Sequence, residues 1–194
     1  MKIKSIRKIN CQSKKYDIMV ERDNNFFANG VLVHNCVMSR EFIHARSEEG
    51  YGKPWQTHVK SQWANFRYEI PEGMEICGEN MYAVHSIEYD KLSSYFYIFG
   101  IVYNGSFLSW KETNEWCQLL GLPIVPTIFI GKLIVNMPIP EKSAFGGICE
   151  GYVARNIDSF KVEDFSGNVA KCVRMNHVQS DIHWTKTWKQ AKLL

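Results

Sequence analysis

Hydrophobic and polar positions follow two periods along this chain. Apolar residues recur at helical spacing between residues 55 and 68, with Trp55, Val59 and Trp63 on one face, and they predict a helix that ends before Pro71. Short runs rich in β-branched and aromatic residues predict strands. The expected strands cover residues 16–21, 31–33, a pair within 37–47, and then 74–80, 95–103, 125–130, 148–155 and 165–174.

A second helix is predicted from the residues at its two ends. Ser109 and Glu112 have the spacing of a capping box, in which each side chain satisfies a free backbone N–H of the first turn. Gly121 and Pro123 supply the stop signal. The expected apolar face consists of Thr113, Trp116, Leu119 and Leu120. Because strands and helices alternate without a regular β-α-β rhythm, an α+β fold is expected.

The overall composition is that of a soluble globular protein, with 45% hydrophobic and 22% charged residues. No apolar run is long enough for a transmembrane helix, and none of signal-peptide type follows the first residues, so no membrane association is expected. The six cysteines form no Cys-x-x-Cys pair and show no zinc-type spacing with the histidines. We therefore expect a reducing, cytoplasmic environment.

The dipeptide Asn35-Cys36 can support self-cleavage of the backbone. The side-chain amide nitrogen of Asn35 can attack its own carbonyl carbon, close a succinimide ring and break the bond to Cys36. His34 lies next to that carbonyl and can donate a proton, since its ordinary pKa is near neutrality. The thiolate of Cys36 could accept an acyl group from another segment. Without further context, these three residues are equally well explained as a polar turn after a strand.

Residues 16–36 resemble the C-terminal splicing blocks of inteins over their whole length. The resemblance implies that residues 1–35 are the C-terminal segment of a split intein and contribute a short β segment of a Hint fold. It implies roles for Asn35 in cyclisation, His34 in assistance, Cys36 as the first residue of the C-extein, and Asp17 as the acidic residue of the upstream block.

The intein segment is too short to act alone. A stretch of 35 residues cannot bury a core of its own, so an N-terminal intein half on another chain is expected. Many relatives carry His where Asn24 stands, and acid-base help is then expected from His34 or from that partner. Residues 1–35 hold seven lysines and arginines against three acidic residues. This basic segment is expected to steer association with an acidic intein partner, and a nucleic-acid-binding arm is the alternative.

Several short motifs follow one another in residues 36–194. Their order and spacing resemble the nucleotidyltransferase motifs of ATP-dependent RNA ligases, above all the T4-phage-type RNA ligase 2 class and its phage and bacterial relatives. The resemblance implies a ligase adenylylation domain of ATP-grasp-like type that lacks its N-terminal part. The motifs are residues 76–80, 82–90, 95–99, 150–155, 168–174 and 176–179.

The same resemblance implies a set of nucleotide-binding residues. Arg46 would hold a phosphate of ATP or of the RNA end, a task suited to a permanently charged guanidinium. Glu79 would accept hydrogen bonds from the ribose hydroxyls. Phe96 would stack on adenine, with Phe99 as the alternative. Taken singly, both phenylalanines are equally compatible with a place in the core, and Glu79 with a surface ion pair.

Three further residues would act on the phosphates. Glu150 would bind Mg²⁺ or orient the nucleophile, and Lys171 would neutralise charge on the α-phosphate. Many relatives carry a second basic residue two positions after that lysine, where Val173 stands here, so Arg174 is the candidate for its role. Outside this ordered set, an isolated Glu-Gly pair is usually a turn and a lone lysine is usually solvated.

The nucleophile expected for this chemistry is absent from the sequence. These ligases attach AMP to the lysine of a Lys-x-Asp-Gly motif, and no Asp-Gly pair occurs in this chain. In the family that motif lies just before the strand containing Arg46, where Cys36 begins. We therefore expect a partner chain that carries this lysine and the N-terminal intein half, and that joins the C-extein by trans-splicing.

The joined product would be an ATP- and Mg²⁺-dependent RNA ligase of the RNA-repair type. It would form a lysyl-AMP and seal the 5′-phosphate and 3′-hydroxyl ends of RNA, whereas the isolated chain would not adenylylate. A DNA ligase and a non-catalytic nucleic-acid-binding remnant are the alternatives.

Overall fold

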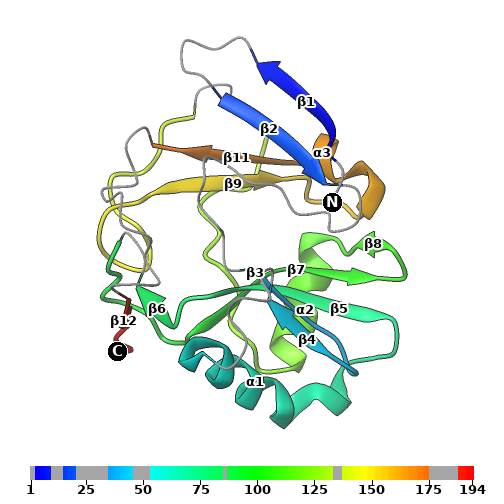
Figure 1. The fold of residues 1–194 in the computed structure, drawn as a ribbon, viewed down its shortest axis with the longest axis vertical. Helices are drawn as coiled ribbons and strands as arrows, with labels where there is room; N and C mark the ends of the chain where they lie inside the picture. The colour runs from blue at the N-terminus through cyan, green and yellow to red at the C-terminus, as the bar shows by residue number, and fades with distance from the viewer. Residues whose placement is uncertain are drawn as a thin grey trace.

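A computed structural model describes residues 3–9, 15–20, 35–45, 53–84, 87–132, 137–174 and 188–194. Figure 1 shows a six-stranded sheet with both longer helices on one side and a two-stranded ribbon over the other. Helix α1 spans Pro54–Phe66 and helix α2 spans Trp110–Leu119. The mixed α and β content agrees with the expected class.

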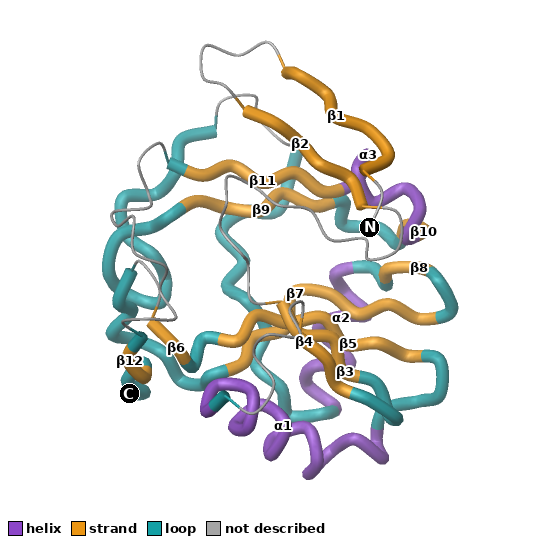
Figure 2. The backbone as a smooth tube through the Cα atoms, in the orientation of Figure 1, coloured by secondary structure: helices purple, strands orange, loops and turns teal. Residues whose placement is uncertain are grey.

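The six-stranded sheet is antiparallel throughout, in the order β10-β8-β7-β5-β3-β4. Figure 2 shows its strands in orange, with the connecting loops in teal and the helices in purple. In chain order they are β3 (Asn35–Met38), β4 (Ile43–Ala45), β5 (Met74–Asn80), β7 (Phe96–Tyr103), β8 (Ser106–Phe107) and β10 (Phe160–Lys161). The strands expected at 74–80 and within 37–47 are confirmed, and β7 begins one residue later than expected.

Three two-stranded ribbons complete the described strands. They are β1 (Ile3–Ile9) with β2 (Lys15–Val20), β6 (Ala83–Val84) with β12 (Lys189–Gln190), and β9 (Gly151–Arg155) with β11 (Val169–Val173). The remaining short elements are the 3₁₀ turns η2 (Arg67–Glu69) and η3 (Val162–Asp164) and the single-turn helix α3 (Phe165–Asn168).

The main core lies between the sheet and the two longer helices. Alternate residues of the strands point toward the helices, as a period of two requires. Val59 of α1 and Cys117 of α2 meet these strand residues. The strand residues buried there are Cys36, Met38, Met74, Ile76, Phe96, Ile98 and Ile101.

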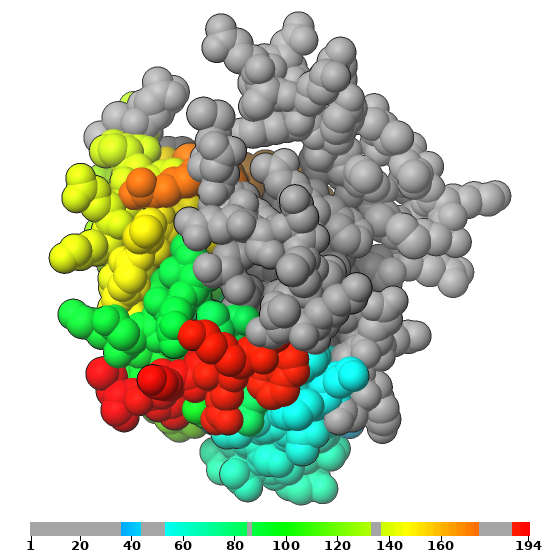
Figure 3. Space-filling model, turned by 60° about the vertical axis from the view of Figure 1, so that its left-hand side comes forward, coloured from blue at the N-terminus to red at the C-terminus, as the bar shows by residue number. Residues whose placement is uncertain are grey.

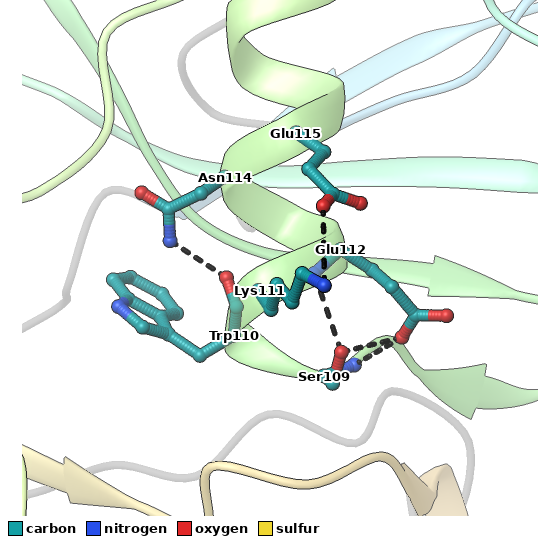
Figure 4. A network of polar contacts seen from close by, with 6 residues as sticks. All are labelled: Ser109, Trp110, Lys111, Glu112, Asn114 and Glu115. Atoms are coloured by element: carbon teal, nitrogen blue, oxygen red, sulfur yellow. Dashed lines mark hydrogen bonds and ion pairs between the residues drawn. The ribbon is translucent and has the colours of Figure 1, made fainter.

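The start of α2 confirms the predicted capping box (Figure 4). The Glu112 backbone N–H donates to Ser109 Oγ over 3.2 Å, and the Ser109 backbone N–H donates to Glu112 Oε2 over 2.9 Å. After the helix, Gly121 has φ +65°, a conformation that favours glycine.

A second, smaller hydrophobic core lies beside the C-terminal segment, residues 188–194. Leu92, Tyr95, Tyr97 and Ala191 are buried together, and the Tyr95 hydroxyl donates to the Ala191 carbonyl over 3.1 Å. The Trp188 ring meets the Trp55 ring of α1 edge-on at 5.0 Å. Figure 3 shows this segment in red, beside α1 in cyan.

Three expectations from the sequence were wrong, two about secondary structure and one about burial. Residues 125–130 form no strand, because Pro126 lacks the N–H that a ladder needs, and Ile128, Phe129 and Ile130 are exposed. Leu119 is 71% exposed and lies outside the core, whereas Cys117 takes the buried position. Residues 165–168 form a helical turn before β11, where a continuous strand was expected. The strand expected at 31–33 lies outside the described residues.

Candidate functional site

The Asn35-Cys36 dipeptide forms the start of a central strand. Strand β3 pairs with β5 on one side, where Asn35 stands opposite Glu79, and with β4 on the other. The Cys36 side chain is 3% exposed and faces the main core. Burial and, to a smaller extent, the charge of Glu79 raise the pKa of the Cys36 thiol to about 12. In this fold the thiol is therefore protonated and inaccessible.

Three of the predicted splicing and phosphate-binding residues cannot be placed fully. His34 and Arg46 lie outside the described residues. Asp17 stands opposite Arg7 in the backbone register of the β1–β2 ribbon. Their proposed roles remain predictions.

The sheet face that points away from the helices carries Glu79. Because Ile76 and Ile98 point to the core, the period of two directs Cys77, Glu79 and Tyr97 to the opposite face. Glu79 stands directly opposite Tyr97 in the ladder between β5 and β7 and is half-buried. This face therefore presents a carboxylate beside an aromatic ring.

The two candidate phenylalanines occupy different environments. Phe96 is 3% exposed and belongs to the core beneath the helices, where its ring fills the space that a side chain on Gly78 would need. A β-bulge makes Phe99 the additional residue of β7, because Gly78 pairs with Ile98 and Cys77 with Gly100. Phe99 is only half-buried. Phe96 is therefore a core residue in this structure, and a stacking role for Phe99 on adenine stays a prediction.

The β9–β11 ribbon is tied to the sheet through Arg155. Its guanidinium donates to the carbonyls of Leu108, over 2.8 Å, and Phe99, over 3.4 Å. The same group lies 5.3 Å from the ring centroid of Trp110 and 5.5 Å from that of Phe160. Arg155 therefore fixes the distance between ribbon and sheet.

Lys171 lies on the ribbon face that points toward the sheet. Val153 is two residues from Arg155 and shares its face, and Lys171 stands opposite Val153 in the ladder. Both side chains are exposed. Lys171 therefore presents an exposed ammonium group on the ribbon face that also carries Arg155.

Glu150 comes directly before β9 and is held by Arg174. The Arg174 backbone N–H donates to the Glu150 carbonyl over 2.9 Å. Its guanidinium donates to the carbonyls of Cys149, over 2.8 Å, and Pro140, over 2.7 Å. Arg174 therefore holds the backbone beside Glu150, and a phosphate contact of Arg174 stays a prediction.

A double-glycine turn brings the segment before Glu150 against residues 87–91. Gly146 and Gly147 have φ values of +81° and +69°, which other residues rarely adopt. The Lys91 backbone N–H donates to the Phe145 carbonyl over 2.8 Å. A side chain on Gly146 would overlap the carboxylate of Asp90. The two glycines are therefore needed for this close approach.

Tyr89 is half-buried and packs against the segment that leads to Glu150. Its ring centroid lies 5.8 Å from that of Phe145. Burial, then the charges of Glu150, Cys149 and Glu79, raise the pKa of the Tyr89 hydroxyl to about 12. The sequence places Tyr89 in a motif, 82–90, without indicating a role for it.

Glu150 is the described carboxylate that the sequence suggested as a magnesium ligand. Among the described residues, no group of three or more His, Cys, Asp or Glu side chains forms a complete metal site. Mg²⁺ commonly takes one or two protein carboxylates and completes its shell with water and substrate phosphates. Glu150 is suited to this mode of binding.

No helix in the described part of the chain is long and apolar enough to cross a membrane.

Comparison with known families gives the general class of the chain. Residues 8–173 match the family described as RNA ligase, and the chain belongs to that family. The match begins inside the segment expected to be an intein. DNA topoisomerase 1 of Pyrococcus furiosus is 53% identical over 38 residues, which are 20% of this chain and 4% of that protein. The chain therefore spans a small fraction of that relative. No solved structure matches the chain.

Proposed function

We propose that this chain supplies most of the adenylylation site of an ATP-dependent RNA ligase. The observation that carries the proposal is the match of residues 8–173 to the RNA ligase family. Glu79 on the sheet face away from the helices, Glu150 directly before β9 and exposed Lys171 on β11 are the residues offered for its site. Membership of the RNA ligase family supports a ligase-type reaction at this place.

The residues present fit ATP and Mg²⁺. Glu79 would accept hydrogen bonds from the ribose, and Phe99 would stack on the adenine ring. Lys171 would bind the phosphates as a point charge, and Arg46 would add a planar donor. Glu150 would hold the ion, which supplies charge neutralisation at the phosphates when bound. The enzyme would seal RNA ends that carry a 5′-phosphate and a 3′-hydroxyl.

The nucleophilic lysine would come from a partner chain. No Lys-x-Asp-Gly motif occurs in the sequence, and residues 16–36 resemble the C-terminal blocks of an intein. Trans-splicing through Asn35 and Cys36 would join the two ligase parts.

Co-expression with the candidate partner tests both parts of the proposal. The partner is an open reading frame of the same genome that ends in an N-terminal intein half after Lys-x-Asp-Gly. We expect a joined protein that lacks residues 1–35 by mass and that seals nicked RNA with ATP. The absence of joined product would exclude trans-splicing.

Two variants separate splicing from ligation. Asn35→Ala should prevent release of residues 1–35, whereas Glu150→Gln should splice normally and lose sealing. A Glu150→Gln ligase with full activity would refute the site assigned here. Faster sealing of nicked DNA than of nicked RNA would instead support the DNA ligase alternative.

A further inference from the structure

Arg155 reaches the β-bulge of strand β7 from the ribbon. The bulge leaves Phe99 outside the regular pairing of β5 with β7, so its backbone groups need other partners. The Phe99 carbonyl accepts a hydrogen bond from Arg155 Nη1 over 3.4 Å. A Cβ atom on the next residue, Gly100, would lie 3.1 Å from the Phe107 ring and 3.6 Å from Arg155 Nη1. The glycine therefore leaves room for this approach.

The guanidinium of Arg155 is held by several contacts that fix its plane. Nη2 donates to the Leu108 carbonyl over 2.8 Å, and Nε donates to the Asn156 carbonyl over 3.2 Å. The rings of Trp110 and Phe160 lie within cation–π distance of the same group. Because a guanidinium is planar and its donors point in fixed directions, these contacts leave it little freedom to rotate.

No ion pair explains the position of Arg155. Among the described residues, no carboxylate pairs with it, although the side chain is half-buried and a buried charge is usually paired. Within the same residues, its hydrogen bonds go to backbone carbonyls. The side chain therefore acts on the geometry of the backbone, and the carbonyl that it holds at the bulge is that of Phe99.

The direction of the Phe99 ring depends on the backbone of the bulge, because a β-bulge re-aims the side chains that it carries. We infer that Arg155 is a positioning residue for adenine, which holds the bulge so that the Phe99 ring stacks on the base. This inference rests on the proposed function, which assigns the stacking to Phe99, and deepens it to the recognition of the base. A lysine ammonium cannot reproduce the planar fork that joins the carbonyls of Phe99 and Leu108.

Binding to the full chain with Mg²⁺ provides the first test. Affinities for ATP and for inorganic tripolyphosphate would be measured by calorimetry for the unmodified chain, for Arg155→Lys, and for Arg67→Lys as a control. Arg67 is also half-buried, donates to the Glu41 carbonyl over 3.3 Å and lies 4.2 Å from the ring centroid of Trp63, outside the proposed site.

Arg155→Lys should weaken the binding of ATP by roughly threefold to tenfold, the loss expected for one hydrogen bond. It should leave the binding of tripolyphosphate unchanged, because that ion has no base, and Arg67→Lys should change neither affinity. An equal loss for both compounds, or an unchanged affinity for ATP, would overturn the inference.

A double-mutant cycle tests whether Arg155 acts through Phe99. Phe99→Leu should itself weaken ATP binding, because it removes the stacking ring. In that background, Arg155→Lys should cause a further loss of less than about twofold, since the two residues then share one effect. Losses that multiply in the double variant would show that Arg155 acts independently of Phe99 and would overturn the inference.

The fold of each variant would be checked by circular dichroism. If Arg155→Lys does not fold, Trp110→Phe takes its place, because it reduces the ring surface against the guanidinium, and the same pattern of losses is expected. No binding of ATP by the unmodified chain would instead overturn the proposed function.

Discussion

At the scale of single residues, position changes what a side chain can do. Cys36 would be a nucleophile at a splice junction, yet here it is a core residue with a pKa of about 12. Burial, then the charges of Glu150, Cys149 and Glu79, likewise raise the pKa of Tyr89 to about 12. In both cases the neighbours are far away in the sequence.

We expect the Cys36 thiol to resist alkylation in the folded chain. With a pKa of about 12, roughly one thiol in ten thousand would be ionised at pH 8, and burial blocks access as well. Labelling with iodoacetamide followed by peptide mass measurement should modify half-buried Cys172 before buried Cys36. In urea the thiols of Cys36 and Cys172 should react at similar rates. Equal labelling without urea would contradict the placement of Cys36 in the core.

At the scale of elements, the sequence predicted a helix correctly where capping residues mark its two ends. The capping box and the positive-φ glycine delimit α2 as predicted. The strand predicted at residues 125–130 is absent. The prediction rested on the apolar composition of this stretch and neglected Pro126, which cannot donate a ladder hydrogen bond. It also failed at Leu119, because helical spacing alone does not reveal where the neighbouring sheet ends.

Ser109→Ala should destabilise the chain by about 1 kcal/mol, as the loss of an N-cap usually does. The variant removes the acceptor for the Glu112 N–H and one half of the reciprocal pair. Urea unfolding followed by tryptophan fluorescence measures the change, and Ser109→Asp serves as the control that retains a cap. An unchanged unfolding midpoint in the alanine variant would show that the box does not contribute to stability.

At the scale of the whole molecule, the proposed splice junction and the ligase sheet compete for the same residues. Strand β3 contains Asn35 and Cys36 and is paired on both sides. An intein active site would have to enclose these residues while two neighbouring strands hold their backbone. We therefore expect that splicing, if Asn35 and Cys36 form the junction, and completion of the sheet exclude each other.

We expect trans-splicing to precede folding of the C-extein. Mixing the N-terminal partner with the prefolded chain should give slow joining, since β3 must first leave the sheet. Diluting the chain from urea into a solution of the partner should give faster joining. Joined product would be followed by gel electrophoresis over time, and equal rates from both starting states would contradict this order.

The sequence by itself determined the ends of α2, most strands of the sheet and the order of the ligase motifs, because these depend on short-range periodicity and capping. It also supplied the predictions that Asn35-Cys36 forms a splice junction and that the nucleophilic lysine lies on another chain. Only the tertiary structure decided that Phe96 is a core residue, that Arg174 holds the backbone near Glu150, and that Tyr89 packs against Phe145. These outcomes depend on a β-bulge, a double-glycine turn and the approach of a ribbon to a sheet, which bring together residues that no local pattern relates.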